Sequence, residues 1–94
     1  MGKMNKKRDR LEVIHDILLI IRDKNNSIKP TPLLRYSNLS SQSFNDYFKE
    51  LKKKEFVKEI IDKKKKKFIT LTDKGFKYLE KYNTILGLIK ELEL

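Results

Sequence analysis

The chain has 94 residues, 38% of them hydrophobic and 38% charged, a length that fits one domain with a small core and little room for an active-site cavity. It has no cysteine and no long apolar run, which excludes a disulfide framework, a thiolate zinc site and a membrane span. The formal net charge of +10 predicts a polyanionic partner, with nucleic acid first and an anionic membrane surface second.

Helical spacing of apolar residues predicts a first helix over residues 8–24, preceded by a flexible basic N-terminus over residues 1–7. The recurring apolar positions are Leu11, Ile14, Leu18 and Ile21. Residues 27–30 are expected to form a short extended segment, because Pro30 has no backbone donor and suits the edge of a sheet.

Two more helices are predicted to follow, with a tight turn at residues 37–39 between them. Thr31 is expected to cap the second helix, with Pro32 at its first helical position. Ser40 is expected to cap a third helix that runs to about Lys54. Four residues at spacings of three and four form its inner face: Phe44, Tyr47, Phe48 and Leu51.

A hairpin and a long last helix complete the predicted order. Residues 56–62 and 67–71 are rich in β-forming residues and predict two strands. The connection over residues 63–66 lacks the Gly or Asn of a tight turn, so we expect a longer, looser loop. Thr72 is expected to cap the last helix, and Gly75 in its first turn to allow close packing. The predicted fold class is mainly α with a small β-hairpin.

Four short runs stand out in this order: Asn-Leu-Ser at 38–40, Tyr-Phe-Lys-Glu-Leu at 47–51, Phe-Ile-Thr-Leu-Thr-Asp-Lys-Gly at 68–75, and Leu-Glu-Lys-Tyr at 79–82. Together they resemble the small archaeal winged-helix DNA-binding proteins with an antiparallel coiled-coil C-terminal helix, over roughly residues 18–89. The resemblance implies a winged helix-turn-helix domain over 8–71, a dimerisation helix over 72–94, and binding to duplex DNA. Glu55 stands where the family usually has glycine, so the bend into the hairpin is expected to differ in detail.

The outer face of the third helix is the expected recognition surface. A repeat of 3.6 residues per turn directs Gln42, Asn45, Asp46, Lys49 and Lys53 outward, with Ser41 and Lys52 at the margins. Gln42 and Asn45 offer the donor–acceptor pair that reads adenine. Asp46 would repel phosphate unless it accepts from a cytosine amino group or pairs with Lys49 or Arg35. The alternative is a plain solvated helix face.

Five consecutive lysines, residues 63–67, span the predicted hairpin loop and the first residue of the returning strand, where their repulsion is unfavourable unless an anion screens them. On a wing they would lie along the DNA backbone or in the minor groove, and such contacts give affinity more than sequence choice. The alternative is a solubilising loop. The expected DNA-binding residues are Arg35, Ser41, Gln42, Asn45, Lys49, Lys52, Lys53, Lys63, Lys64, Lys65, Lys66 and Lys67.

The last helix carries two apolar stripes, one formed by Leu79, Tyr82, Leu86 and Ile89, the other by Tyr78, Ile85, Leu88 and Leu92. One stripe is enough to dock a helix on its own domain, so the second is expected to pair with another copy. The expected dimer interface is Tyr78, Ile85, Leu86, Leu88, Ile89 and Leu92. The alternative is that both stripes pack against the first helix.

These features predict a cytoplasmic, nucleoid-associated homodimer that binds duplex DNA as a transcriptional regulator or an architectural chromatin-type protein. We expect no enzymatic activity, cofactor or metal, and we expect His15 to be a partly buried helix residue, not a ligand. One alternative is a winged-helix protein–protein interaction module without direct DNA binding. RNA binding is a further alternative, although the aromatic sheet or clamp loop of common RNA modules is not apparent.

Overall fold

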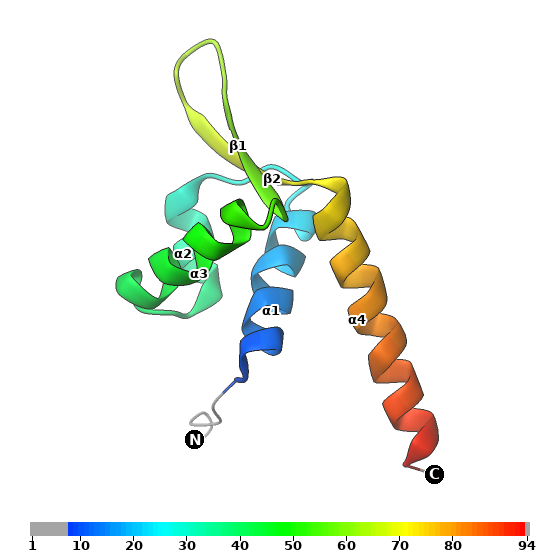
Figure 1. Ribbon diagram of the computed structural model, residues 1–94. Coiled ribbons are helices and arrows are strands. Elements are labelled where there is room, and N and C mark those ends of the chain that lie inside the picture. The colour runs from blue at the N-terminus through cyan, green and yellow to red at the C-terminus, as the bar shows by residue number, and fades with distance from the viewer. Residues whose placement is uncertain (1–7, 94) are drawn as a thin grey trace.

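The computed structural model describes residues 8–93, which form four helices and one antiparallel hairpin. The order is α1 (Arg10–Asp23), α2 (Pro30–Ser37), α3 (Ser41–Lys53), β1 (Val57–Ile61), β2 (Lys67–Leu71) and α4 (Asp73–Leu92). The predicted class, mainly α with a small β-hairpin, is confirmed. The basic segment predicted over residues 1–7 lies outside the described residues. Figure 1 shows the hairpin projecting beyond the helices, and the C-terminal half of α4 extending away from them.

The first helix, α1, begins two residues later than predicted because Asp9 caps it. The Asp9 carboxylate accepts from the backbone N–H of Glu12 at 2.8 Å, and the Glu12 side chain accepts in return from the Asp9 N–H at 3.2 Å. This reciprocal capping box satisfies two free donors at the helix start. The buried face of α1 comprises Val13, Ile14, Ile17, Leu18 and Ile21.

The extended segment predicted over residues 27–30 is present only as far as Lys29, because Pro30 begins α2 and does not lie at a sheet edge. Ile28 pairs with Ile69 of β2, and its N–H donates to the Ile69 carbonyl at 3.2 Å while its carbonyl accepts from the Ile69 N–H at 2.8 Å. The predicted cap of the second helix is wrong: α2 starts at Pro30, with Lys29 in the cap position, so Thr31 lies inside the helix. Proline suits the first helical position because its φ is fixed and its missing N–H would have no partner there.

The hairpin connection is longer than a two-residue turn, as expected, but it is held by hydrogen bonds, so the expectation of a loose loop is wrong. The Asp62 N–H donates to the Lys66 carbonyl at 2.9 Å, which leaves three residues in the loop. The Asp62 carboxylate accepts from the N–H groups of Lys64 and Lys66, both at 2.9 Å. Lys65 takes the left-handed conformation, with φ 64°, that glycine usually supplies in this type of turn. Asp62 therefore compensates for the missing glycine.

The junction of α3, the hairpin and α4 is closely packed. Glu55 adopts φ 65°, so a non-glycine residue holds the left-handed position that ends α3. The carbonyl of Phe56 accepts from the Thr72 N–H at 3.1 Å, and the Thr72 hydroxyl accepts from the Gly75 N–H at 3.2 Å, as expected of a cap. A Cβ on Gly75 would lie 2.3 Å from the Phe56 carbonyl oxygen. The expectation that Gly75 allows close packing is therefore confirmed.

Candidate nucleic-acid interface

The turn between α2 and α3 fixes the direction in which α3 leaves the body. Asn38 closes α2 in the left-handed conformation, with φ 61°. The buried Ser37 hydroxyl donates to the Leu34 carbonyl at 2.7 Å and accepts from the Leu39 N–H at 3.3 Å. Ser40 then caps α3, its hydroxyl accepting from the Ser43 N–H at 3.1 Å. The tight turn and the Ser40 cap agree with the sequence-based prediction.

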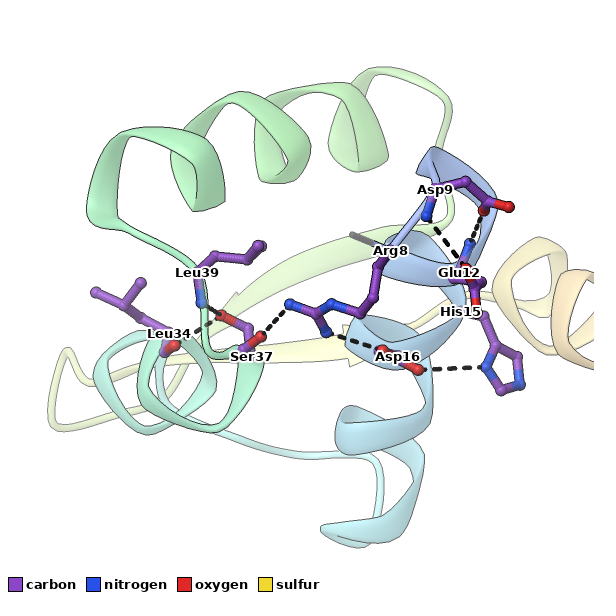
Figure 2. A network of polar contacts seen from close by, with 8 residues as sticks. All are labelled: Arg8, Asp9, Glu12, His15, Asp16, Leu34, Ser37 and Leu39. Atoms are coloured by element: carbon purple, nitrogen blue, oxygen red, sulfur yellow. Dashed lines mark hydrogen bonds and ion pairs between the residues drawn. The ribbon is translucent and has the colours of Figure 1, made fainter. Parts of the chain in front are cut away.

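Arg8 ties this turn to α1 (Figure 2). Its guanidinium donates to the Asp16 carboxylate at 2.8 Å and to the Ser37 carbonyl at 2.9 Å. Two bonds from one planar group to α1 and to the turn restrict how the helix-turn-helix can shift. This role was not predicted, because Arg8 and Ser37 are 29 residues apart and share no local pattern.

The outer face of α3 is as exposed as helical spacing predicts. Ser41, Gln42, Asn45, Asp46, Lys49, Lys52 and Lys53 are all exposed, whereas Phe44, Phe48 and Leu51 are buried and Tyr47 is half-buried. The two buried rings stack with centroids 5.6 Å apart, and the Lys52 ammonium lies 5.2 Å from the Phe48 centroid. The inner face is therefore confirmed, and the polar residues are available to a partner.

A groove joins α3 to the hairpin, with a volume of about 270 Å³. The predicted residues that line it are Asn45, Lys49 and Lys52 from α3 and Lys67 from β2. Glu59 of β1 lies between the two elements, and its carboxylate oxygens are each 3.6 Å from an ammonium, one of Lys52 and one of Lys67. The side chains of the third helix and of the hairpin thus share one surface.

The hairpin tip extends this surface toward the start of α2. Lys63, Lys64 and Lys66 surround a shallow hollow together with Lys29, Phe68 and the acidic Asp62. The Lys29 ammonium lies 6.0 Å from the Phe68 ring centroid. Lys66 and Lys67 line a second hollow with the first residues of α2. All five lysines of residues 63–67 are exposed. The tip therefore concentrates positive charge beside the groove.

Several predicted residues lie apart from the groove lining, among them Ser41 and Gln42 in the first turn of α3 and Lys65 at the wing tip. Arg35 is exposed in the last turn of α2, and Lys53 is exposed at the end of α3. Asp46 is one helical step beyond Asn45, on the side away from the hairpin, and no ion pair joins it to another of residues 8–93. The pairing of Asp46 with Lys49 or Arg35 is therefore not formed within the described residues.

Sequence reasoning missed three further residues of this surface. Lys29 was counted as part of the extended segment, Glu59 as an ordinary strand residue, and Asp62 as the end of a strand. The burial pattern of β1 carries one usable signal, because Glu59 follows the buried Val57 by two residues and must share its face. The sequence gives no comparable indication that Lys29 lies beside the hairpin, since that position depends on the bridge between Ile28 and Ile69.

The last helix divides into a docked half and an exposed half. Gly75 and Leu79 are buried, and the His15 and Tyr82 rings stack at 4.1 Å across α1 and α4, so His15 is partly buried as expected. The Tyr78 hydroxyl donates to the Leu11 carbonyl at 3.1 Å, and burial raises the pKa of this phenol. Beyond Tyr82 the apolar residues are exposed: Ile85, Leu86, Leu88, Ile89 and Leu92.

This arrangement separates Tyr78 from the other five expected interface residues. Tyr78 contacts its own domain, including the Phe56 ring at a centroid distance of 5.4 Å. The remaining five share no such cover within residues 8–93, and Ile85 and Leu88 are 56% and 54% exposed. The alternative that both stripes pack against α1 therefore fails for the C-terminal half of α4.

Residues 8–93 were also compared with the requirements of a membrane-spanning helix and of a metal site. None of the helices within residues 8–93 has the length and hydropathy that a bilayer-spanning helix requires. In the same part of the chain, no three His, Asp or Glu side chains are grouped so that they would hold a metal ion.

Comparison with known proteins gives a consistent result. A family model described as winged helix-turn-helix matches residues 7–90. The DNA-binding protein Sso10a-2 from Sulfolobus solfataricus is similar in structure, with a TM-score of 0.71, 17% identity, and coverage of 92% of this chain and 86% of Sso10a-2. A comparison with curated proteins gave no match.

A second similar structure is MepR, a transcription regulator of the Staphylococcus aureus multidrug efflux pump MepA. Its TM-score is 0.73 at 15% identity, and the alignment covers 85% of this chain and 60% of MepR. At these identities the two likenesses establish the shared fold.

Proposed function

This chain belongs to the winged helix-turn-helix family, and from that membership we propose that it binds duplex DNA through α3 and the lysine-rich hairpin. Helix-turn-helix proteins insert the second helix of the motif into the major groove. Here that helix is α3, and the hairpin is the wing. By name, one of the two similar structures is a DNA-binding protein and the other is a transcription regulator, which supports the proposal.

The observation that carries the proposal is the continuity of the cationic surface. Asn45, Lys49 and Lys52 from α3 line one groove with Lys67 from the wing, and the wing tip adds its lysines beside it. A duplex seated on α3 would therefore meet the wing along the same backbone. Separate cationic patches on opposite sides of the domain would not grip one double helix.

We assign different roles to the two parts of this surface. Gln42 and Asn45, in the first turns of α3, would contact base edges, whereas the lysines of α3 and of the wing would contact phosphates. Lysine supplies a point charge without the planar fork that reads guanine, so most of the affinity would be independent of sequence. Such a protein would act as a regulator with modest selectivity or as an architectural protein, by binding and without catalysis.

The proposal is tested by mobility shifts on random and genomic duplexes across a salt series. If roughly six phosphates are neutralised per protomer, the log of the association constant should fall with the log of salt concentration at a slope of about −5 per protomer. Binding to all duplexes alike would indicate an architectural role, and preference for a few genomic fragments a regulator. No shift of any duplex, with retention on an acidic protein instead, would favour a protein-interaction module.

We also propose that the chain is a homodimer joined by the C-terminal half of α4. The five exposed apolar residues beyond Tyr82 form a continuous face, and the charged residues among positions 83–94 are limited to Lys90, Glu91 and Glu93. A nearly neutral, apolar helix face is unfavourable in contact with water. A second copy of the same helix can cover it, because its apolar residues have the same spacing. The dimer would keep both DNA-binding surfaces away from the shared helix pair.

Leu88→Asp is expected to weaken dimerisation by at least about a hundredfold, because an unpaired carboxylate would be buried twice in a symmetric interface. Asn83→Asp is the matched control, since it adds the same charge on the opposite side of α4. Sedimentation velocity at micromolar concentration should give a dimer for the wild-type chain and the control, and a monomer for Leu88→Asp. A wild-type chain that sediments as a monomer would contradict the dimer.

We propose, finally, a cytoplasmic location in association with the nucleoid, which follows from a duplex partner and from the net charge of +10. The alternative of a pure protein-interaction module has less support. It gives no reason for five consecutive lysines to lie beside the groove of the recognition helix.

A further inference from the structure

Glu59 is an unexpected residue at the centre of the cationic surface. Among the described residues that line the groove between α3 and the wing, it is the only acidic one, beside Lys49, Lys52 and Lys67. Its side chain is 26% exposed, so the carboxylate is partly withdrawn from water but reachable from the groove. A negative charge here opposes the binding of a polyanion and therefore requires an explanation.

The geometry shows what the carboxylate does in the free protein. One oxygen lies 3.6 Å from the Lys52 ammonium and the other 3.6 Å from the Lys67 ammonium. These distances are longer than a direct hydrogen bond, so the pairs are loose and exchangeable. Lys52 belongs to the recognition helix and Lys67 to the wing, and one carboxylate thus neutralises part of the charge of both elements. A phosphate between the same lysines would take over both partners.

We propose that Glu59 is an internal counterion whose place between Lys52 and Lys67 is taken by a DNA phosphate on binding. This inference rests on the proposed duplex binding. The carboxylate lowers affinity for every sequence equally, because it competes with phosphate and not with bases. Because this penalty is the same for all sequences, it leaves the ratio of affinities for two duplexes unchanged. Glu59 therefore sets the overall affinity for duplex DNA and not the choice of sequence.

The test compares Glu59→Gln with Glu80→Gln, an exposed position on α4 that undergoes the same charge change. Glu59→Gln should bind a random duplex about threefold more tightly at 0.1 M salt, as expected for unit charges about 6 Å apart in a mainly aqueous medium. The slope of log affinity against log salt should stay close to that of the wild-type chain, since the same phosphate lies between Lys52 and Lys67 in both complexes. Glu80→Gln should change the affinity less than about twofold, because its charge is screened at a greater distance.

A double-mutant cycle makes the mechanism specific. If Glu59 occupies Lys67 in the free protein, Lys67→Gln should weaken binding less in the wild-type background than in the Glu59→Gln background. Thermal unfolding of each variant, followed by circular dichroism, should remain cooperative. This verifies that differences in affinity arise from a folded domain.

Each other outcome overturns the inference. Equal effects of Glu59→Gln and Glu80→Gln would mean that only net charge matters. Weaker binding by Glu59→Gln would mean that the carboxylate positions the lysines or accepts from a cytosine amino group. A wild-type chain that shifts no duplex would overturn the proposed function itself, whereas duplex binding without a Glu59 effect would overturn the counterion alone.

Discussion

Replacing Lys63, Lys64 and Lys66 by glutamine is expected to weaken binding to every duplex by about two orders of magnitude at 0.1 M salt. These three side chains surround the hollow at the wing tip, where the Asp62 turn holds their backbone in a fixed shape. Each phosphate contact adds about 0.9 to the slope of log affinity against log salt, so the loss of three contacts should reduce that slope by about 2.7. Titration of a labelled random duplex at several salt concentrations measures both quantities.

The matched control replaces Lys74, Lys77 and Lys81 by glutamine, which removes the same charge from exposed positions on α4. Its effect should be several-fold at most, because screening reduces the influence of charges that do not contact DNA. If both triple variants lose affinity equally, the wing has no special role and only the net charge attracts DNA. If the wing variant keeps a slope of about −5, phosphates are not bound by the wing tip.

Gly75→Ala is expected to lower the free energy of unfolding by about 2 kcal/mol, which corresponds to a fall in Tm of about 10 °C. The new Cβ would lie 2.3 Å from the Phe56 carbonyl oxygen, a backbone atom that also accepts from the Thr72 N–H. Relief of this overlap would move α4 away from the hairpin. The gain in helix propensity, about 1 kcal/mol, offsets only part of the overlap.

Gly87→Ala controls for that propensity, because nothing lies within 4 Å of its added Cβ. It lies on the same helix and should raise the Tm or leave it unchanged. Thermal unfolding of both variants at one protein concentration gives the comparison. A stable Gly75→Ala chain would mean that the contact of α4 with the hairpin is looser than the structure indicates.

The sequence predicts correctly those parts of the fold that depend on residues a few positions apart. The inner face of α3 follows from the spacing of Phe44, Phe48 and Leu51, and the caps at Ser40 and Thr72 follow from a side-chain oxygen three residues before a free N–H. The wrong predictions also have local causes. Pro30 and Pro32 both suit the first turn of a helix, and Asp62 replaces the glycine that a tight hairpin turn usually needs.

The candidate site was predictable in its residue types but not in its arrangement. Helical spacing indicates which α3 side chains face outward, and a lysine run indicates a cationic loop. That α3 and the wing share one groove depends on tertiary packing, since Lys52 and Glu59 are brought together across the bend at Glu55. The Arg8 contacts to Ser37 and Asp16 depend on packing in the same way and leave no pattern in the sequence.

Titration of isotopically labelled protein with a random duplex, followed by amide chemical shifts, tests the single binding surface most directly. The amides of residues 41–53 and 62–67 should shift together at one stoichiometry, and those of residues 85–92 should remain unchanged. Shifts confined to α3 or to the wing, or centred on the exposed half of α4, would contradict the account.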